Sequence, residues 1–183
     1  MAKNEVRIIG GKWRGRKLKF PDAKGLRPSQ GRARETLFNW LASWVLDARV
    51  LDLFAGTGAL GLEALSRGAA HVTFIDKGRV ARRLILQNIE RARAEGQTRF
   101  LLRDATRFGP ADAPGANLVF CDPPYGRDLA GMALVAAHQA GWIAGGAVVV
   151  AEDQGGTEPP TGFSLEDSRR YGDTTLSFLV AGD

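Results

Sequence analysis

One stretch of the chain constrains the fold more than any other: an apolar run, a glycine turn and then a second apolar run at helical spacing. The first run, Val50–Phe54, contains one acid, Asp52, and is typical of a strand covered on both faces in a parallel sheet. Gly56 and Gly58 allow the backbone to turn tightly and to approach a ligand closely. The second run predicts a helix that ends at Gly68, where a glycine cap belongs.

Two classes of cofactor are bound by such a turn. Residues 56–61 satisfy G-x-G-x-x-G, and Asp76 lies about twenty residues beyond, as a dinucleotide fingerprint requires. In that fingerprint a pyrophosphate lies at the helix N-terminus, where the carboxylate of Asp52 would repel it. The pattern Asp-x-Phe-x-Gly-x-Gly of residues 52–58 instead resembles the first motif of S-adenosylmethionine-dependent methyltransferases, whose ligand is a cationic sulfonium with an amino-acid tail. We therefore favour the methyltransferase interpretation.

The rest of the chain predicts alternating strands and helices. Strands are expected at 71–76, 99–105, 118–122 and 147–152, helices from about residue 79 and over 130–140, and two final antiparallel strands at 163–170 and 174–180. This order predicts an open α/β sheet with an antiparallel end. An earlier helix is expected from Ser29, as its N-cap, to Leu46, with Trp40 and Trp44 in the core rather than stacked on nucleic-acid bases.

Charge is unevenly distributed along the chain. Residues 1–34 contain eleven Lys or Arg and two acids, a net charge of +9, whereas the remainder has fourteen basic and eighteen acidic residues, a net charge of −4. A cationic arm on an acidic body indicates a nucleic-acid partner, with a solvated tail as the alternative. Within it, residues 5–20 predict a β-hairpin that presents the cations Arg7, Lys12, Arg14, Arg16, Lys17 and Lys19. Trp13, at its tip, would either stack on an RNA base or cover the edge of the domain.

Composition excludes several classes of protein. One Cys and two His give neither a disulfide framework nor a metal-ligand cluster, so no metal is expected. No apolar run approaches the roughly 20 residues that span a bilayer, and no signal-peptide core follows Met1, so we expect a cytoplasmic protein with no membrane partner. The 183 residues suit one domain with a small extension. We assign residues 1–25 to a basic hairpin extension and residues 26–183 to the main domain.

The fourth predicted strand of the main domain ends in Asp122-Pro123-Pro124-Tyr125, which suits methylation of an exocyclic base amine. The lone pair of such an amine is delocalised, so the site must accept its hydrogen bonds and stabilise charge that develops on nitrogen. Asp122 supplies a carboxylate, the Pro123 carbonyl a second acceptor, and the two prolines stiffen the turn. Tyr125 offers a face on which the base can stack. Cys121 lies within the apolar strand and is expected to be a buried thiol, not a nucleophile.

Acids that end two other predicted strands complete the expected site. The carboxyl ends of parallel strands share one crevice with the glycine turn. Asp76 would there reach the ribose hydroxyls of a cofactor. Asp104 would either accept a hydrogen bond from an adenine amino group or cap the next turn.

Taken together, the motifs resemble the RsmD family of bacterial 16S rRNA guanine-N2 methyltransferases over nearly the whole chain. The residues that carry the resemblance are 7–18, 26–29, 34–39, 52–58, 122–125 and 171–174. The resemblance implies a class I, Rossmann-like fold with a seven-stranded, mostly parallel sheet, an antiparallel last strand and an N-terminal β-hairpin that engages rRNA. It also implies a single guanine of 16S rRNA as the target, modified in the 30S subunit or an assembly intermediate. We expect a monomer.

The resemblance further assigns residues to roles. Binding of S-adenosyl-L-methionine falls to Arg27, Ser29, Asp52, Phe54, Gly56, Gly58, Asp76, Asp104, Ala105 and Asp122. Catalysis falls to Asp122, Pro123, Pro124 and Tyr125, and RNA binding to Arg7, Lys12, Trp13, Arg14, Arg16 and Lys17. Departures from the family pattern are small and concern Gln30, Gly31, Asp76 and Asn117.

Two alternative functions stay open. The Asp-Pro-Pro-Tyr turn suits any exocyclic amine, so the first alternative is an adenine-N6 or cytosine-N4 methyltransferase, although the chain is short for a separate target-recognition domain. The second is a non-catalytic rRNA-binding assembly factor that kept a methyltransferase body. The intact glycine turn and Asp122 argue against the second.

Overall fold

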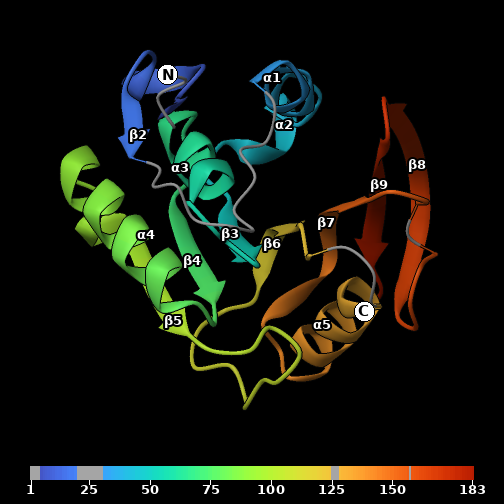
Figure 1. Ribbon diagram of the computed structural model, residues 1–183. Coiled ribbons are helices and arrows are strands. Elements are labelled where there is room, and N and C mark those ends of the chain that lie inside the picture. The colour runs from blue at the N-terminus through green and yellow to red at the C-terminus, as the bar shows by residue number, and fades with distance from the viewer. Residues whose placement is uncertain (1–4, 20–30, 125–127, 157) are drawn as a thin grey trace.

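A seven-stranded sheet forms the centre of the molecule. The computed structural model describes residues 5–19, 31–124, 128–156 and 158–183 (Figure 1). The strands of the sheet are β3 (Arg49–Leu53), β4 (His71–Asp76), β5 (Thr98–Leu102), β6 (Ala116–Cys121), β7 (Ile143–Asp153), β8 (Phe163–Tyr171) and β9 (Thr174–Ala181). They lie in the order β5-β4-β3-β6-β7-β9-β8; the first five are parallel, and β9 runs antiparallel to both of its neighbours. The predicted α/β sheet with an antiparallel end is confirmed.

Each face of the sheet is covered by its own hydrophobic core, because side chains alternate along the buried strands. On β6, Phe120 belongs to one core and Val119 and Cys121 to the other. The first core is covered by the N-terminal hairpin and by α1 (Gly31–Trp40), α2 (Ala42–Val45), α3 (Ala59–Ser66) and α4 (Arg79–Ala92); the second is covered by α5 (Leu129–Gln139). No helix in the described part of the chain is long and apolar enough to cross a membrane.

The basic N-terminal segment folds as the predicted hairpin. Strand β1 (Glu5–Arg7) pairs antiparallel with β2 (Lys17–Lys19), and the short 3-10 turn η1 (Gly11–Trp13) lies between them. Trp13 is only 6% exposed and packs in the first core. Of the two interpretations offered for Trp13, the structure therefore shows the one in which it covers the edge of the domain.

The helix expected to reach Leu46 is broken. α1 ends at Trp40, the buried Leu41 follows, and the single turn of α2 begins at Ala42. Trp40 packs on Phe178 with 3.8 Å between ring centroids, but Trp44 stacks on the outer side of Trp40 and is 44% exposed. The prediction that Trp44 lies in the core is wrong, because helical spacing was counted across the break at Leu41.

Candidate active site

Carboxylates gather where neighbouring parallel strands end. Strand β3, which carries Asp52, pairs with β4 on one side and β6 on the other. Asp76 ends β4, and Asp122 follows β6 directly. Burial raises the pKa of Asp52 to about 8; a hydrogen bond from the backbone of Gly61 opposes this shift, and the charges of Asp122 and Asp76 add to it. The sheet thus brings together three acids that the sequence assigned to the site.

The glycine turn has the backbone conformation expected of it. Gly56 and Gly58 have φ angles of 58° and 78°, in the left-handed region that favours glycine. Phe54 also has a positive φ, 58°, which is unusual for a non-glycine residue and typical of functional turns. Gly61, the third glycine of the pattern, permits close packing of α3 on the sheet, since an added Cβ would lie 2.4 Å from the ring of Phe74.

Asp76 is tied to the turn through both carboxylate oxygens. Its Oδ2 accepts a 2.9 Å hydrogen bond from the backbone N–H of Gly56, and its Oδ1 accepts a 2.7 Å bond from that of Gly78. The carboxylate is half-buried beside the glycine turn. Because each oxygen can accept a second hydrogen bond, these contacts are compatible with the expected ribose contact.

Asp52 lies deeper than expected. It is 2% exposed, and its Oδ2 accepts a 3.2 Å hydrogen bond from the backbone N–H of Gly61 in the first turn of α3. Its carboxylate therefore complements the helix N-terminus. Within residues 5–19, 31–124, 128–156 and 158–183, no Lys or Arg forms an ion pair with Asp52, Asp76 or Asp122. The site is therefore rich in carboxyl groups that no described basic side chain pairs with.

Asp122 has a partner that the sequence reasoning missed. Burial and the neighbouring carboxylate of Glu152 raise the pKa of Asp122 to about 7, and burial also raises the pKa of Glu152. Glu152 lies on β7, beside β6, where Cys121 is in register with Ala151. The sequence did contain a signal for Glu152, because the fifth predicted strand, at 147–152, also ended in this acid.

Cys121, which ends β6, is buried, and burial varies along the prolines that follow Asp122. Pro123 is buried and Pro124 is exposed. Burial, and then the charges of Asp122 and Asp52, raise the pKa of the Cys121 thiol far above its usual range, so Cys121 is the inert core thiol that was expected. Tyr125, Arg27 and Ser29, which were also assigned to the site, lie outside the described residues. Among those described, no three His, Cys, Asp or Glu form a metal-binding group.

Asp104 lies in a turn and not at the end of a strand. β5 ends at Leu102, three residues earlier than expected. Oδ1 of Asp104 accepts hydrogen bonds from the backbone N–H and the hydroxyl of Thr106, at 2.9 and 2.8 Å, and these bonds lower the pKa of Asp104. The capping role is thus observed, whereas a hydrogen bond to adenine stays a prediction. Ala105, next to it, is buried.

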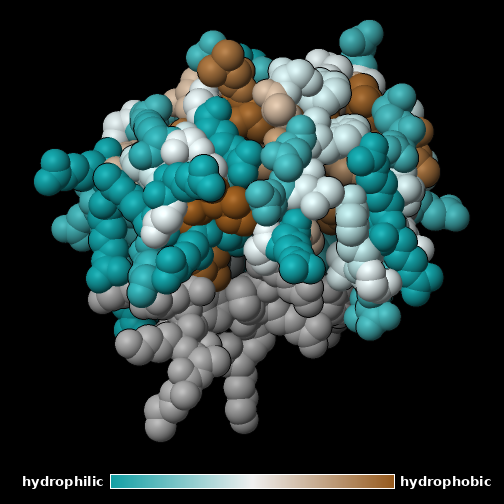
Figure 2. All heavy atoms as spheres, turned by 90° about the horizontal axis from the view of Figure 1, so that it is seen from above, coloured by the Kyte–Doolittle hydropathy of each residue, from teal (hydrophilic) through white to brown (hydrophobic). Residues whose placement is uncertain are grey.

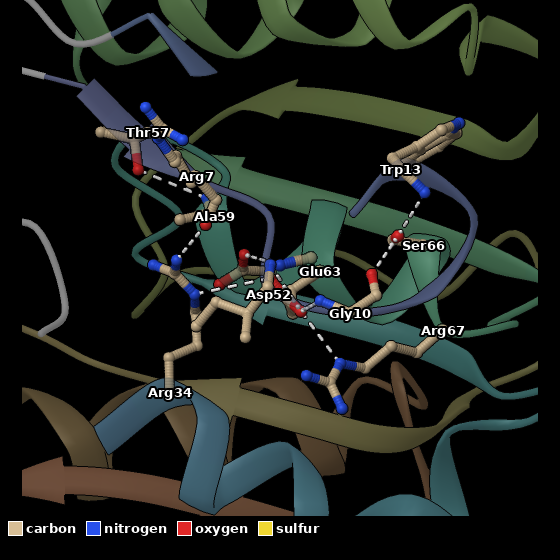
Figure 3. Close-up of polar contacts among 12 residues, drawn as sticks. Arg7, Gly10, Trp13, Arg34, Asp52, Thr57, Ala59, Glu63, Ser66 and Arg67 are labelled. Atoms are coloured by element: carbon tan, nitrogen blue, oxygen red, sulfur yellow. Dashed lines mark hydrogen bonds and ion pairs between the residues drawn. The ribbon is translucent and has the colours of Figure 1, made fainter. Parts of the chain in front are cut away.

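A second buried carboxylate, Glu63, fastens the hairpin to α3 (Figure 3). Its side chain is 0% exposed and accepts backbone hydrogen bonds from Ile9, at 2.9 Å, and Gly10, at 2.8 Å. Arg34 and Arg67 flank it, with Nε–Oε distances of 3.5 and 2.9 Å. Sequence reasoning missed this cluster, because Glu63 looks like an ordinary polar position of an amphipathic helix.

Three further hydrogen bonds complete the hairpin anchor, which we define as Glu63, Ser66, Arg34 and Arg67. The hydroxyl of Ser66 accepts a 2.9 Å hydrogen bond from the backbone N–H of Trp13 and donates one to the carbonyl of Gly10. Arg34 is buried and also donates to the carbonyl of Arg7. Arg34 thereby links α1 to both the hairpin and α3.

The outer surface of the hairpin is cationic. Figure 2 views the molecule from the end that carries the hairpin and α1, and hydrophilic side chains cover most of this face. The side chains of five predicted RNA contacts, Arg7, Lys12, Arg14, Arg16 and Lys17, are exposed. Trp13 is the exception: its buried ring lies beneath Lys12, whose Nζ is 4.5 Å from the ring centroid. Because the core holds the indole, Trp13 does not present its ring face to an RNA base.

The strand order, the single antiparallel strand β9 and the glycine turn after β3 define a class I methyltransferase fold. The family described as conserved hypothetical protein 95 matches residues 6–180, and the chain belongs to this family, that of the RsmD proteins. It is 45% identical over 150 residues to ribosomal RNA small subunit methyltransferase D of Escherichia coli, covering 82% of this chain and 75% of the relative.

Two further relatives extend the comparison. The protein of the same name from Haemophilus influenzae is 38% identical over 156 residues, covering 84% of this chain and 81% of the relative. The solved structure of the Escherichia coli protein yhhF superposes with a TM-score of 0.85 at 37% identity, covering 97% of this chain and 98% of the other. The predicted family and fold are confirmed.

Proposed function

We propose that this protein is an S-adenosyl-L-methionine-dependent methyltransferase that modifies the N2 amine of one guanine in 16S rRNA. The observation that carries the proposal is the convergence of Asp52, Asp76 and Asp122 around the glycine turn, at the carboxyl edge of a class I methyltransferase sheet. The similarity to the small-subunit rRNA methyltransferases supports the substrate class. An rRNA substrate is also consistent with a cytoplasmic location.

The acidic site suits a cationic methyl donor. Burial raises the pKa values of Asp52 and Asp122, and no described Lys or Arg pairs with them, so a bound cation would favour their ionised forms. Asp76 would hold ribose hydroxyls, and the backbone of the turn at Gly56 and Gly58 allows close approach. When bound, S-adenosylmethionine supplies the electrophilic methyl group.

The residues after β6 handle the amine. The two N–H groups of the amine donate hydrogen bonds to the carboxylate of Asp122 and the carbonyl of Pro123, which orients the nitrogen and stabilises the positive charge that develops on it. Asp122 then takes up the proton that the nitrogen loses. The raised pKa of Asp122, about 7, makes its carboxylate a better proton acceptor than an ordinary aspartate.

Methyl transfer to small ribosomal subunits from a strain that lacks the modification tests the proposal. We expect one labelled methyl group per subunit, and mass analysis of the digested RNA should identify N2-methylguanosine. N6-methyladenosine or N4-methylcytidine would reassign the substrate. Absence of S-adenosylmethionine binding in calorimetry would overturn the enzyme assignment and favour an RNA-binding assembly factor. Parallel assays on free 16S rRNA would show whether the assembled 30S particle, or an assembly intermediate, is required.

A further inference from the structure

The hairpin and the candidate active site lie at opposite ends of α4. At the C-terminal end, Arg16 donates a 3.4 Å hydrogen bond to the carbonyl of Arg91, and Lys12 donates a 3.2 Å bond to Gln97, just beyond the helix. At the N-terminal end, Gly78 donates to Asp76, which also holds the glycine turn. The 14 residues of α4 are about 20 Å long. Helix α4 therefore offers a path along which an RNA can contact both the hairpin cations and the site.

The outward surface of α4 is cationic along that path. Arg79, Arg82 and Arg83 are exposed and spaced three and four residues apart, so they share one side of the helix. Ile85, Ile89 and Ala92 belong to the first core. The buried side chains of α4 lie on the opposite side of the helix from the three arginines: Ala81, Leu84, Ile85, Asn88, Ile89 and Ala92. The α4 arginines, as we name Arg79, Arg82 and Arg83, therefore project into solvent beside the route from hairpin to site.

The positions of the α4 arginines destabilise the helix slightly, and no ion pair within the described residues offsets this effect. Like charges three and four residues apart destabilise a helix slightly, and Arg79 in the first turn also opposes the helix dipole, with no acid there to offset it. Within the described ranges of the chain, none of the α4 arginines forms an ion pair. The only acid in α4, Glu90, lies seven residues beyond Arg83, about two turns away. An external anion would offset the repulsion.

We infer that the α4 arginines are a second RNA-binding surface, which contacts the phosphate backbone of the substrate between the hairpin and the active site. The inference rests on the proposed function for the identity of the substrate, but not for the charge pattern. Contacts of this kind position the RNA and are independent of base sequence. Guanidinium groups suit them, because their planar donors can bind phosphate oxygens in pairs.

A sequence-neutral probe tests the surface. We choose a fluorescein-labelled 20-residue poly(U), with affinity measured by anisotropy at several KCl concentrations. The matched variants are Arg83→Glu, on α4, and Arg170→Glu, an exposed arginine on β8 at the opposite edge of the sheet. Arg83→Glu should weaken binding several-fold and the pair Arg82→Glu/Arg83→Glu at least tenfold. Each lost contact should reduce the salt slope by about 0.7, and Arg170→Glu should leave affinity within twofold.

The same variants separate this inference from the proposed function. On small subunits, Arg82→Glu/Arg83→Glu should raise the KM for the particle while S-adenosylmethionine affinity stays at the wild-type value, which also shows that the variant is folded. If the double variant and Arg170→Glu bind poly(U) equally well and with equal salt slopes, the inference that the α4 arginines bind RNA is wrong, even if the wild type methylates subunits. If instead the wild type transfers no methyl group but the double variant loses poly(U) binding as described, the surface stands and the proposed function fails.

Discussion

Two buried carboxylates contact the same helix, α3, and their environments are opposite. Asp52, at the first turn, accepts one backbone hydrogen bond, and its strongest charged neighbours are two more acids. Glu63, farther along, accepts hydrogen bonds from two backbone N–H groups and lies between two arginines. A buried charge is costly unless it is paired. The Glu63 carboxylate is therefore paired within the fold and has a structural role. Asp52 has no basic partner among the described residues, so its site can accept a cationic ligand.

The largest expected effect is on stability, at the paired carboxylate. Glu63→Ala would remove the carboxylate that pairs with the buried Arg34 and that accepts hydrogen bonds from two hairpin N–H groups, so we expect a loss of about 3–5 kcal/mol in unfolding free energy. Urea denaturation measures it. Glu63→Gln, which keeps one acceptor oxygen, should lose less. The exposed Glu90→Ala on α4 is the control and should stay within about 0.5 kcal/mol; an equally small loss for Glu63→Ala would refute the anchor.

The next effect is on activity, at the unpaired carboxylates. Asp122→Ala removes the proposed acceptor of the amine hydrogens and should slow methyl transfer at least about a hundredfold, equivalent to about 2.7 kcal/mol. Its unfolding free energy should not fall, because the variant removes a repelling buried acid. In the wild type, activity should decline as the pH falls below about 7, since protonated Asp122 cannot accept the proton. Single-turnover assays measure the effect, and the control is Glu166→Ala, which replaces an exposed acid on β8. Near-normal methyl transfer by Asp122→Ala would refute the catalytic role of Asp122.

A third expectation concerns the pH dependence of stability. Burial raises the pKa of Asp52 to about 8, whereas in the unfolded chain it would be near 4. The folded state therefore retains a proton that the unfolded state releases, and stability is lost as the pH rises from about 4 to about 8. Asp52→Asn should reduce this slope by about 1 kcal/mol per pH unit. Urea titrations between these limits measure it, and parallel curves for variant and wild type would show that Asp52 is already ionised in the fold.

The contrast between the two carboxylates also marks how far the sequence could be interpreted. The site acids were predictable because each of Asp52, Asp76 and Asp122 lies at or near the end of an apolar strand, and the ends of parallel strands meet at one edge. The Glu63 cluster was not predictable, because only Arg67 lies nearby in the chain, four residues away. The other partners, Arg34 and the backbone amides of Ile9 and Gly10, come from segments 29 to 54 residues away, and the amides have no side-chain signature.

The predictions for the end of β5, for Trp44 and for Trp13 also depended on tertiary structure that sequence spacing does not show. The third strand was predicted to reach residue 105, but its apolar run and its pairing both end at Leu102, and Asp104 caps the turn that follows. Trp44 follows the helical spacing of Trp40, yet the break at Leu41 turns it outward. Trp13 was ambiguous by composition alone, and only the position of the hairpin on α3 decides that it is buried.

The smallest effect tests whether the two regions are independent. Ser66→Ala removes the acceptor for the buried backbone N–H of Trp13 and a donor to Gly10, and should destabilise the protein by about 1–2 kcal/mol. Faster hydrogen exchange at the Trp13 amide should accompany the loss, and the exposed Ser164→Ala on β8 should show neither effect. Affinity for S-adenosylmethionine should remain within twofold, because the hydrogen bonds of Asp52 and Asp76 involve other residues. If affinity falls with stability, the hairpin and the cofactor turn are coupled through α3, and hairpin docking would then be a means by which bound RNA could influence the cofactor site.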